Sequence, residues 1–178
     1  AGEANTASNL SNGSGLFSSK VGVDLEFKSL KTGSNILITG TSDYLMISNS
    51  ISSASSQIGA DVTMTNANQY YDGPSILLTP GTWFIAGTVT CGRAGTTLTQ
   101  YTSKLWDSST VLGSTQASHP SQNPHYVSMA TNGIVSISSS ATWKISCAAT
   151  VANSLIKAAC PNNGAGNNAS HIRAIKLN

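Results

Sequence analysis

The sequence predicts an all-β protein: an N-terminal intertwined β-ribbon shaft followed by an antiparallel jelly-roll sandwich, assembled as a homotrimer. Apolar and polar residues alternate in many short segments, as in strands with one buried face. Clusters of Gly, Pro, Asn and Ser separate these segments at the short spacing typical of sandwiches. No segment shows the 3.6-residue apolar period of an amphipathic helix.

Composition and charge narrow the classes of partner. Only 9% of the 178 residues are charged, and the formal net charge is +2. An average soluble domain has about 25% charged residues. No basic run exists to follow a phosphate backbone, so we expect no nucleic-acid partner. No apolar run approaches the ~20 residues that span a bilayer, so membrane insertion is not expected either. The start, AGEANTASNL, is interpreted as a cut within a longer protein or as the end of a trimmed chain.

The N-terminal third is expected to contain a lead-in, a shaft and a hinge. Residues 1–15 are small and polar and predict an extended linker. Residues 16–48 predict a β shaft with strands near 16–20 and 22–30 and a hairpin that pairs 35–39 with 44–48. Residues 49–60 are rich in serine and predict a flexible hinge.

Residues 61–178 predict the jelly-roll head. Strands are expected at 61–66, 75–80, 82–91, 98–107, 109–114, 126–138, 141–150, 154–160 and 171–178, with a turn at 70–75 and a Pro-interrupted loop at 119–125. The segment 126–138 is expected as one long strand or as two strands joined at 131–133. Strands 98–107 and 109–114 should form a hairpin, as should 141–150 and 154–160. In the strand 82–91, alternation predicts one shared face for Trp83, Ile85, Gly87, Val89 and Cys91.

The shaft has an apolar side that one chain has little means to cover. In the segment 22–30, apolar residues alternate with Asp24, Glu26 and Lys28, and the hairpin adds further apolar residues. Isolated ribbons of this size are marginal in water. Three copies around a threefold axis would cover each other's apolar side. The residues expected to line that axis are Val23, Leu25, Phe27, Ile36, Ile38, Leu45 and Ile47.

Residues 2–48, which include GEANTASNLSNGSGLFSSKVGVDLEFKSLKTGSNILIT, resemble a recurring module of bacteriophage tail-fibre and related virion proteins. The later patterns DGPS, LTPGTW, GTVT and KLWD are similar to phage fibre-head domains, which have trimeric jelly rolls like those of the tumour necrosis factor and complement-component-q families. The resemblance implies a homotrimeric, distal, receptor-binding piece of a virion fibre, extracellular when acting and joined on its N-terminal side to the rest of the fibre. Such heads often lack cysteine, whereas this chain has three.

No enzyme and no cofactor are expected. The chain has only seven Asp and Glu residues, and none falls in a pattern that predicts a catalytic pair across a cleft. The abundant serines lack a GxSxG elbow. His119 and His125 bracket the loop HPSQNPH at a spacing that fits no standard zinc pattern. They are interpreted as solvated loop residues, and an intersubunit metal on the threefold axis is the alternative.

The expected activity is binding, with a host-surface glycan as the first choice and a receptor protein as the second. Aromatic faces that stack on sugars, together with nearby polar groups, occur at three predicted turns, and loops on a rigid scaffold often carry recognition. The candidate ligand-binding residues are Tyr70, Tyr71, Asp72, Trp106, Asp107, His119, Asn123, His125 and Tyr126. Core packing or trimer contact is the alternative role for the aromatic residues. A purely structural module that drives trimerisation, or a secreted complement-like ligand, are the alternative functions.

The three cysteines, Cys91, Cys147 and Cys160, fit no metal or redox motif. The favoured interpretation is that all three are small buried hydrophobic residues. A Cys147–Cys160 bridge across a chain reversal near Asn153 is the alternative.

Overall fold

A computed structural model describes residues 17–21, 24–27, 31, 36–40, 45–49, 51–93, 96–119, 125–160 and 169–177. The chain divides into two compact units, Ala1–Ser50 and Ile51–Asn178, and each is described by itself. The described residues form no helix, so they include no helix that could cross a membrane.

The N-terminal unit contains two antiparallel strand pairs. β1 (Phe17–Val21) pairs with β2 (Asp24–Phe27), and β3 (Ile36–Gly40) pairs with β4 (Leu45–Asn49). The predicted hairpin between 35–39 and 44–48 is thus confirmed. Of the predicted interface residues in the first pair, Val23 lies outside the described residues, as do the side chains of Leu25 and Phe27. The predicted lead-in, 1–15, also lies outside them.

The β3–β4 hairpin exposes apolar side chains on both faces. Ile38 lies opposite Ile47, which places the four predicted residues of this hairpin on one face. In the single chain, Ile36, Leu45 and Ile47 are 45%, 49% and 63% exposed. The other face carries two further large apolar side chains, Leu37 and Met46, which are exposed to a similar extent.

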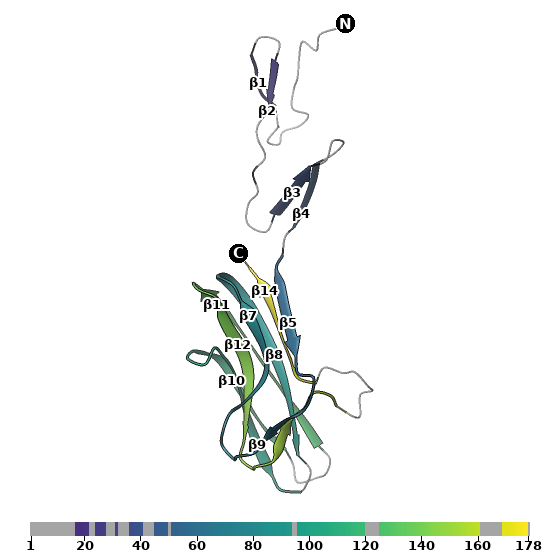
Figure 1. The fold of residues 1–178 in the computed structure, drawn as a ribbon, viewed down its shortest axis with the longest axis vertical. Helices are drawn as coiled ribbons and strands as arrows, with labels where there is room; N and C mark the ends of the chain where they lie inside the picture. Colours follow the sequence, from purple (N-terminus) through teal and green to yellow (C-terminus); the bar gives the residue numbers. More distant parts are fainter. Residues whose placement is uncertain are drawn as a thin grey trace. The chain divides into compact units, whose positions relative to one another are not determined.

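The second unit is an antiparallel β-sandwich (Figure 1). Its strands are β5 (Ser53–Gln57), β6 (Val62–Met64), β7 (Tyr71–Leu78), β8 (Gly81–Arg93), β9 (Thr99–Trp106), β10 (Val111–His119), β11 (His125–Ile137), β12 (Ala141–Ala149), β13 (Ser154–Ile156) and β14 (His171–Lys176). One sheet has the order β10-β9-β12-β7. The other has the order β5-β14-β8-β13-β6, with β11 paired along the free side of β8.

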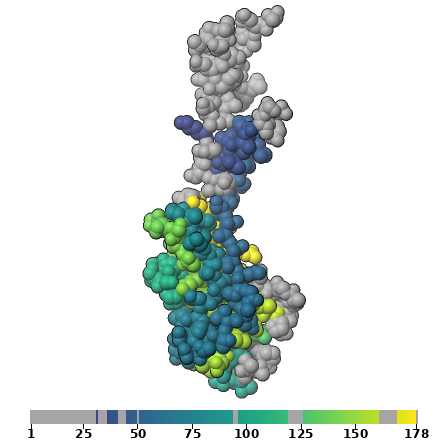
Figure 2. Space-filling model, viewed as in Figure 1, coloured from purple at the N-terminus to yellow at the C-terminus, as the bar shows by residue number. Residues whose placement is uncertain are grey.

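The strand order is that of a jelly roll. When the eight main strands are numbered along the chain, with the short β6 and β13 left aside, one sheet reads first–eighth–third–sixth and the other second–seventh–fourth–fifth. The predicted antiparallel sandwich is therefore confirmed. Strands far apart in sequence share one surface, so blue atoms of β7 adjoin green atoms of β12 in Figure 2.

The core lies between the two sheets and follows from the alternation in each strand. The predicted inner face of β8 is confirmed, because every second residue from Trp83 to Cys91 is buried. Ile145 and Leu105, from the facing sheet, are fully buried against this surface. The Trp83 indole Nε1 donates a hydrogen bond to the Thr79 carbonyl oxygen at 2.9 Å. The outer residue Phe84 is 37% exposed.

The predicted Ser-rich hinge, 49–60, is wrong in part. Residues 53–57 form β5, which pairs with β14 through five residue pairs at the edge of the six-stranded sheet. Small serine side chains supply little apolar signal, but the backbone of a neighbouring strand is enough to hold an edge strand. The sandwich unit therefore begins at Ile51 rather than at the predicted residue 61.

The predicted turn at 70–75 is also wrong, because β7 begins at Tyr71 and runs through this segment. Asp72 lies opposite Ser146 and Ser75 opposite Lys144, so β7 has one extra residue here, a β-bulge. Since β7 is an edge strand, Pro74 costs no ladder bond on its free side. A Cβ on Gly73 would lie 2.9 Å from the Ile145 carbonyl oxygen, so only glycine allows this close approach.

A third correction concerns pairing at 154–160. β13 does not form a hairpin with β12; it pairs with β6 and β8 in the opposite sheet. By contrast, the predicted β9–β10 hairpin is confirmed, with β10 extending further than expected, to His119. The segment 126–138 forms one long strand, β11, rather than two.

Candidate binding surface on the four-stranded sheet

A cluster of aromatic and charged side chains lies on the outer face of the four-stranded sheet. Strand β12 runs between β7 and β9, and the register places Ser146 opposite both Asp72 and Lys104. One step further along, Lys144 lies opposite Trp106. The residues between these positions point into the core. The strand period therefore brings side chains from three strands together on one surface.

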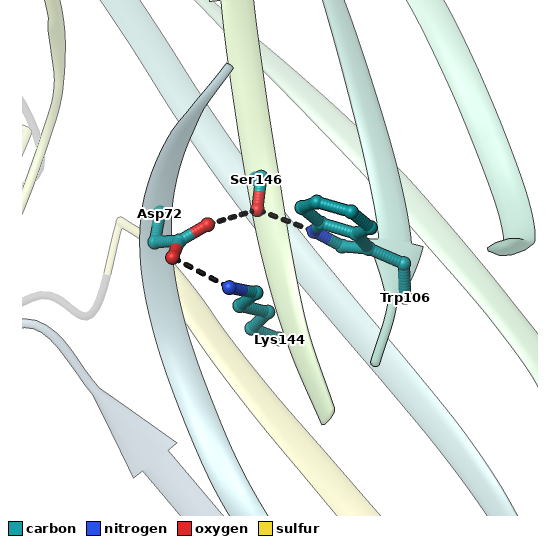
Figure 3. Close-up of polar contacts among 4 residues, drawn as sticks. All are labelled: Asp72, Trp106, Lys144 and Ser146. Carbon is teal, nitrogen blue, oxygen red and sulfur yellow. Dashed lines mark hydrogen bonds and ion pairs between the residues drawn. The ribbon is translucent and has the colours of Figure 1, made fainter. Parts of the chain in front are cut away.

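Hydrogen bonds connect four residues of this cluster (Figure 3). The Trp106 indole Nε1–H donates to Ser146 Oγ at 2.7 Å, and that hydroxyl donates to Asp72 Oδ1, also at 2.7 Å. The second carboxylate oxygen, Oδ2, accepts a hydrogen bond from Lys144 Nζ at 2.7 Å. Each side chain thus holds the next, and the orientation of the Trp106 ring is fixed.

The ammonium of Lys104 lies between two aromatic rings. Its Nζ is 3.3 Å from the centroid of the Trp106 ring and 4.1 Å from that of the Tyr70 ring. A second ammonium, that of Lys144, is 5.0 Å from the Trp106 centroid. These are cation–π distances. Part of the Trp106 ring is therefore covered by lysine, while Tyr70 remains 37% exposed.

The electrostatics of the cluster favour a charged carboxylate. Partial burial raises the pKa of Asp72, but hydrogen bonds from Lys144 and Ser146 and the charges of Lys144 and Lys104 outweigh this effect, so that its pKa is lowered overall. Burial lowers the pKa of Lys104, with the Asp72 charge opposing the shift. Two lysines around one carboxylate leave the ionised cluster with a net positive charge.

Three predicted ligand-binding residues, Tyr70, Asp72 and Trp106, are brought together here. Lys104, Lys144 and Ser146 were not predicted. The signal was available for Lys104, because a two-residue period places it on the same face as Trp106. No local signal joins them to Lys144 and Ser146, whose strand lies about 40 residues further along the chain.

Tyr71 and Asp107 lie elsewhere. The Tyr71 hydroxyl accepts a hydrogen bond from the Asn66 backbone N–H at 2.9 Å and lies 2.7 Å from the Thr65 hydroxyl, while the ring packs against the core. Asp107 closes the β9–β10 turn, where its Oδ1 accepts hydrogen bonds from the backbone N–H groups of Ser109 and Thr110. Those backbone hydrogen bonds lower the pKa of Asp107 despite some burial.

Asp107 also borders a shallow depression of about 320 Å³ at one end of the sandwich. Hydroxyl groups line much of it, from Thr110, Ser136, Ser138 and Ser139. Trp143, which is almost fully buried, also lines it, and among the described residues its indole N–H has no hydrogen-bond partner.

The third predicted group does not join the cluster. Tyr126 is half-buried on β11, in the opposite sheet, with Lys157 Nζ 5.7 Å from its ring centroid. Lys157 in turn forms an ion pair with Asp61. His119 ends β10 and His125 begins β11, but their side chains, and all of Asn123, lie outside the described residues. Within the part of the chain that the structure describes, no group of three or more metal-ligating side chains converges.

Comparisons with known proteins find a similarity to solved structures. No family model matches the chain, and no curated protein matches it. Among solved structures, the chain is similar to PRD1 vertex protein P5, with 18% sequence identity and a TM-score of 0.41. The alignment covers 85% of this chain and 87% of that one.

Proposed function

We propose that this chain is the distal part of a viral fibre, most simply a bacteriophage fibre, that attaches to a host-cell surface glycan as a homotrimer and has no enzymatic activity of its own. The resemblance of residues 2–48 to a virion fibre module supports the fibre assignment. The observation that carries the assembly is the exposure of large apolar side chains in the β3–β4 hairpin.

The β3–β4 hairpin supports assembly because both of its faces are apolar and open. A two-stranded ribbon has no core of its own, and exposed apolar surface of this kind typically marks an interaction site. Ile47 on one face and Met46 on the other are each at least half exposed. Interwound copies of the same ribbon would cover both faces, whereas a flat partner would cover only one.

The outer face of the six-stranded sheet supports association of the heads as well. Phe84 lies opposite Ile134 on one side and Ile175 on the other, so a row of apolar side chains crosses three strands. These side chains are 37%, 60% and 46% exposed. A row of this kind on a sheet face suits contact with a second copy.

The cluster around Trp106 on the four-stranded sheet supports a glycan as the ligand, and the positive charge of this cluster favours an acidic glycan. Its members are Tyr70, Asp72, Lys104, Trp106, Lys144 and Ser146. Tyr70 and the uncovered part of Trp106 offer ring surface to sugar C–H groups. Lys104 and Lys144 exceed the single carboxylate of Asp72, so a carboxylate or phosphate on the sugar would be attracted. Neutral glycans would lack this contribution.

The test is a glycan array probed with the full chain as a trimer. We expect binding to acidic glycans, and a loss of at least about tenfold for Trp106→Ala and Lys104→Ala with the trimer intact. Leu77→Ala is the matched control, since Leu77 is an exposed residue on the same sheet face. Tyr126→Ala tests the other predicted group. Undiminished binding of Trp106→Ala and Lys104→Ala would refute this surface as the binding site.

The alternative function is a structural fibre or capsid-decoration module that drives trimerisation without a ligand. One observation favours it: the polar groups of Asp72, Ser146 and Trp106 are hydrogen-bonded to each other, as in a network that stabilises a sheet face. A stable trimer that binds neither glycans nor host cells would decide for this alternative.

A further inference from the structure

Two cysteines meet in the core between the sheets of the sandwich. Cys91 lies on β8 in the six-stranded sheet, and Cys147 lies on β12 in the four-stranded sheet. Both are fully buried, and their Sγ atoms are 2.9 Å apart. Non-bonded carbon atoms are best placed about 3.5–4.0 Å apart, and sulfur is larger than carbon. The two sulfur atoms are therefore closer than two thiols would normally lie.

The surroundings favour an uncharged, apolar form of this pair. Both residues belong to a buried cluster that also contains Met64, Val89, Tyr101, Met129, Ile145, Ala149 and Ile156. The hydrogen bond with Cys147 and the burial raise the pKa of the Cys91 thiol well above its usual value. Thiolate chemistry and metal ligation both need the ionised form, so neither suits the pair once the sandwich has folded. A disulfide is neutral and apolar, and inter-sheet disulfides occur in the cores of other β-sandwiches.

We infer that Cys91 and Cys147 form a disulfide that joins the two sheets, and that Cys160 stays a thiol. In the structure all three are free cysteines, which corresponds to the reduced protein. The bond would link residues 56 positions apart and close β9, β10 and β11 into one covalent loop. This pairing differs from the Cys147–Cys160 alternative that the sequence allowed.

The oxidation needs an electron acceptor, for which a low-molecular-weight disulfide such as oxidised glutathione suffices. One cysteine thiolate attacks a glutathione sulfur and releases one reduced glutathione. The second cysteine thiolate then displaces the other glutathione from the mixed disulfide. The pair loses two protons and two electrons, and two reduced glutathione molecules form. Because both thiols are buried in the folded sandwich, exchange takes place before the sheets close.

The test is thiol counting and peptide mapping of the full chain refolded with oxidised glutathione. After alkylation in denaturant without reductant, we expect one labelled cysteine per chain, Cys160, and a linked pair of peptides that contains Cys91 and Cys147. Cys160→Ala should leave the linked pair in place and remove the label. Cys147→Ala should give two labelled thiols.

A stability measurement gives a second readout on the same proteins. Reductant should lower the denaturation midpoint of the wild-type chain and of Cys160→Ala, and should leave that of Cys147→Ala unchanged. Three labelled thiols after oxidative refolding, or a bond that includes Cys160, would overturn the inference. The mapping needs only the wild-type chain, so it decides the question even if the core variants fail to fold.

Discussion

Replacing Ile47 tests whether other copies of the chain cover the β3–β4 hairpin. Complete burial of an isoleucine side chain stabilises by about 1.5–3 kcal/mol. Ile47 is 63% exposed in the single chain. Burying this exposed part of the side chain on assembly contributes about 1–2 kcal/mol per chain and about 3–6 kcal/mol per trimer. Since each 1.4 kcal/mol is a factor of ten, Ile47→Ala should weaken trimer formation roughly 10²- to 10⁴-fold. Ile47→Asp should abolish it, because a carboxylate would have to be buried without a partner.

The assay is sedimentation equilibrium over a concentration series, with circular dichroism to show that the sandwich remains folded. Val111→Asp is the matched control, since Val111 is also about half exposed but lies in the sandwich unit. It should sediment as wild type does. A trimer of Ile47→Asp as stable as the wild-type trimer would refute the role of this hairpin in assembly.

Two further predictions concern the sandwich unit. Gly73→Ala should lower the free energy of unfolding by about 1–3 kcal/mol, because its Cβ would meet the Ile145 carbonyl oxygen at 2.9 Å. Gly59→Ala should change the free energy of unfolding little, because a Cβ added there would meet no atom of another described residue within 4 Å. Equal denaturation midpoints of the two variants would contradict this. For Asp72, the folded-state pKa lies below the unfolded value, so its contribution to stability is present above about pH 4 and is lost as the pH falls through the folded-state pKa. In urea denaturation, the free energy of unfolding of the wild type should therefore exceed that of Asp72→Asn by about 1 kcal/mol or less from pH 8 to pH 5, because the carboxylate is half exposed. This difference should vanish at lower pH. A difference that grows on acidification would contradict the ion pair with Lys144.

Much of the sandwich could be predicted from local pattern. Alternation in β8 identified its buried face, and the turn-forming Asp107–Ser109 segment identified the β9–β10 hairpin. Where pairing joins distant segments, local pattern fails. Nothing in the sequence of Ser53–Gln57 indicates that β14 will pair with it, and nothing near Ser154 indicates that β13 will join β6. Such contacts depend on the whole sheet.

The candidate site, too, could be predicted from local pattern only in part. The sequence identifies Tyr70, Asp72 and Trp106 as candidate ligand-binding residues, but it places them in separate turns. They meet because β7 and β9 both pair with β12, which adds Lys144 and Ser146 between them. The lysine over the Trp106 ring could not be expected from composition, although the two-residue period was consistent with it.

The central claim, that this chain acts as a threefold assembly, is tested most directly by the mass of the wild-type chain in solution. Sedimentation equilibrium at micromolar concentration should give the mass of three chains, unchanged on dilution to the nanomolar range. A well-folded species with the mass of one chain across that range would contradict the account.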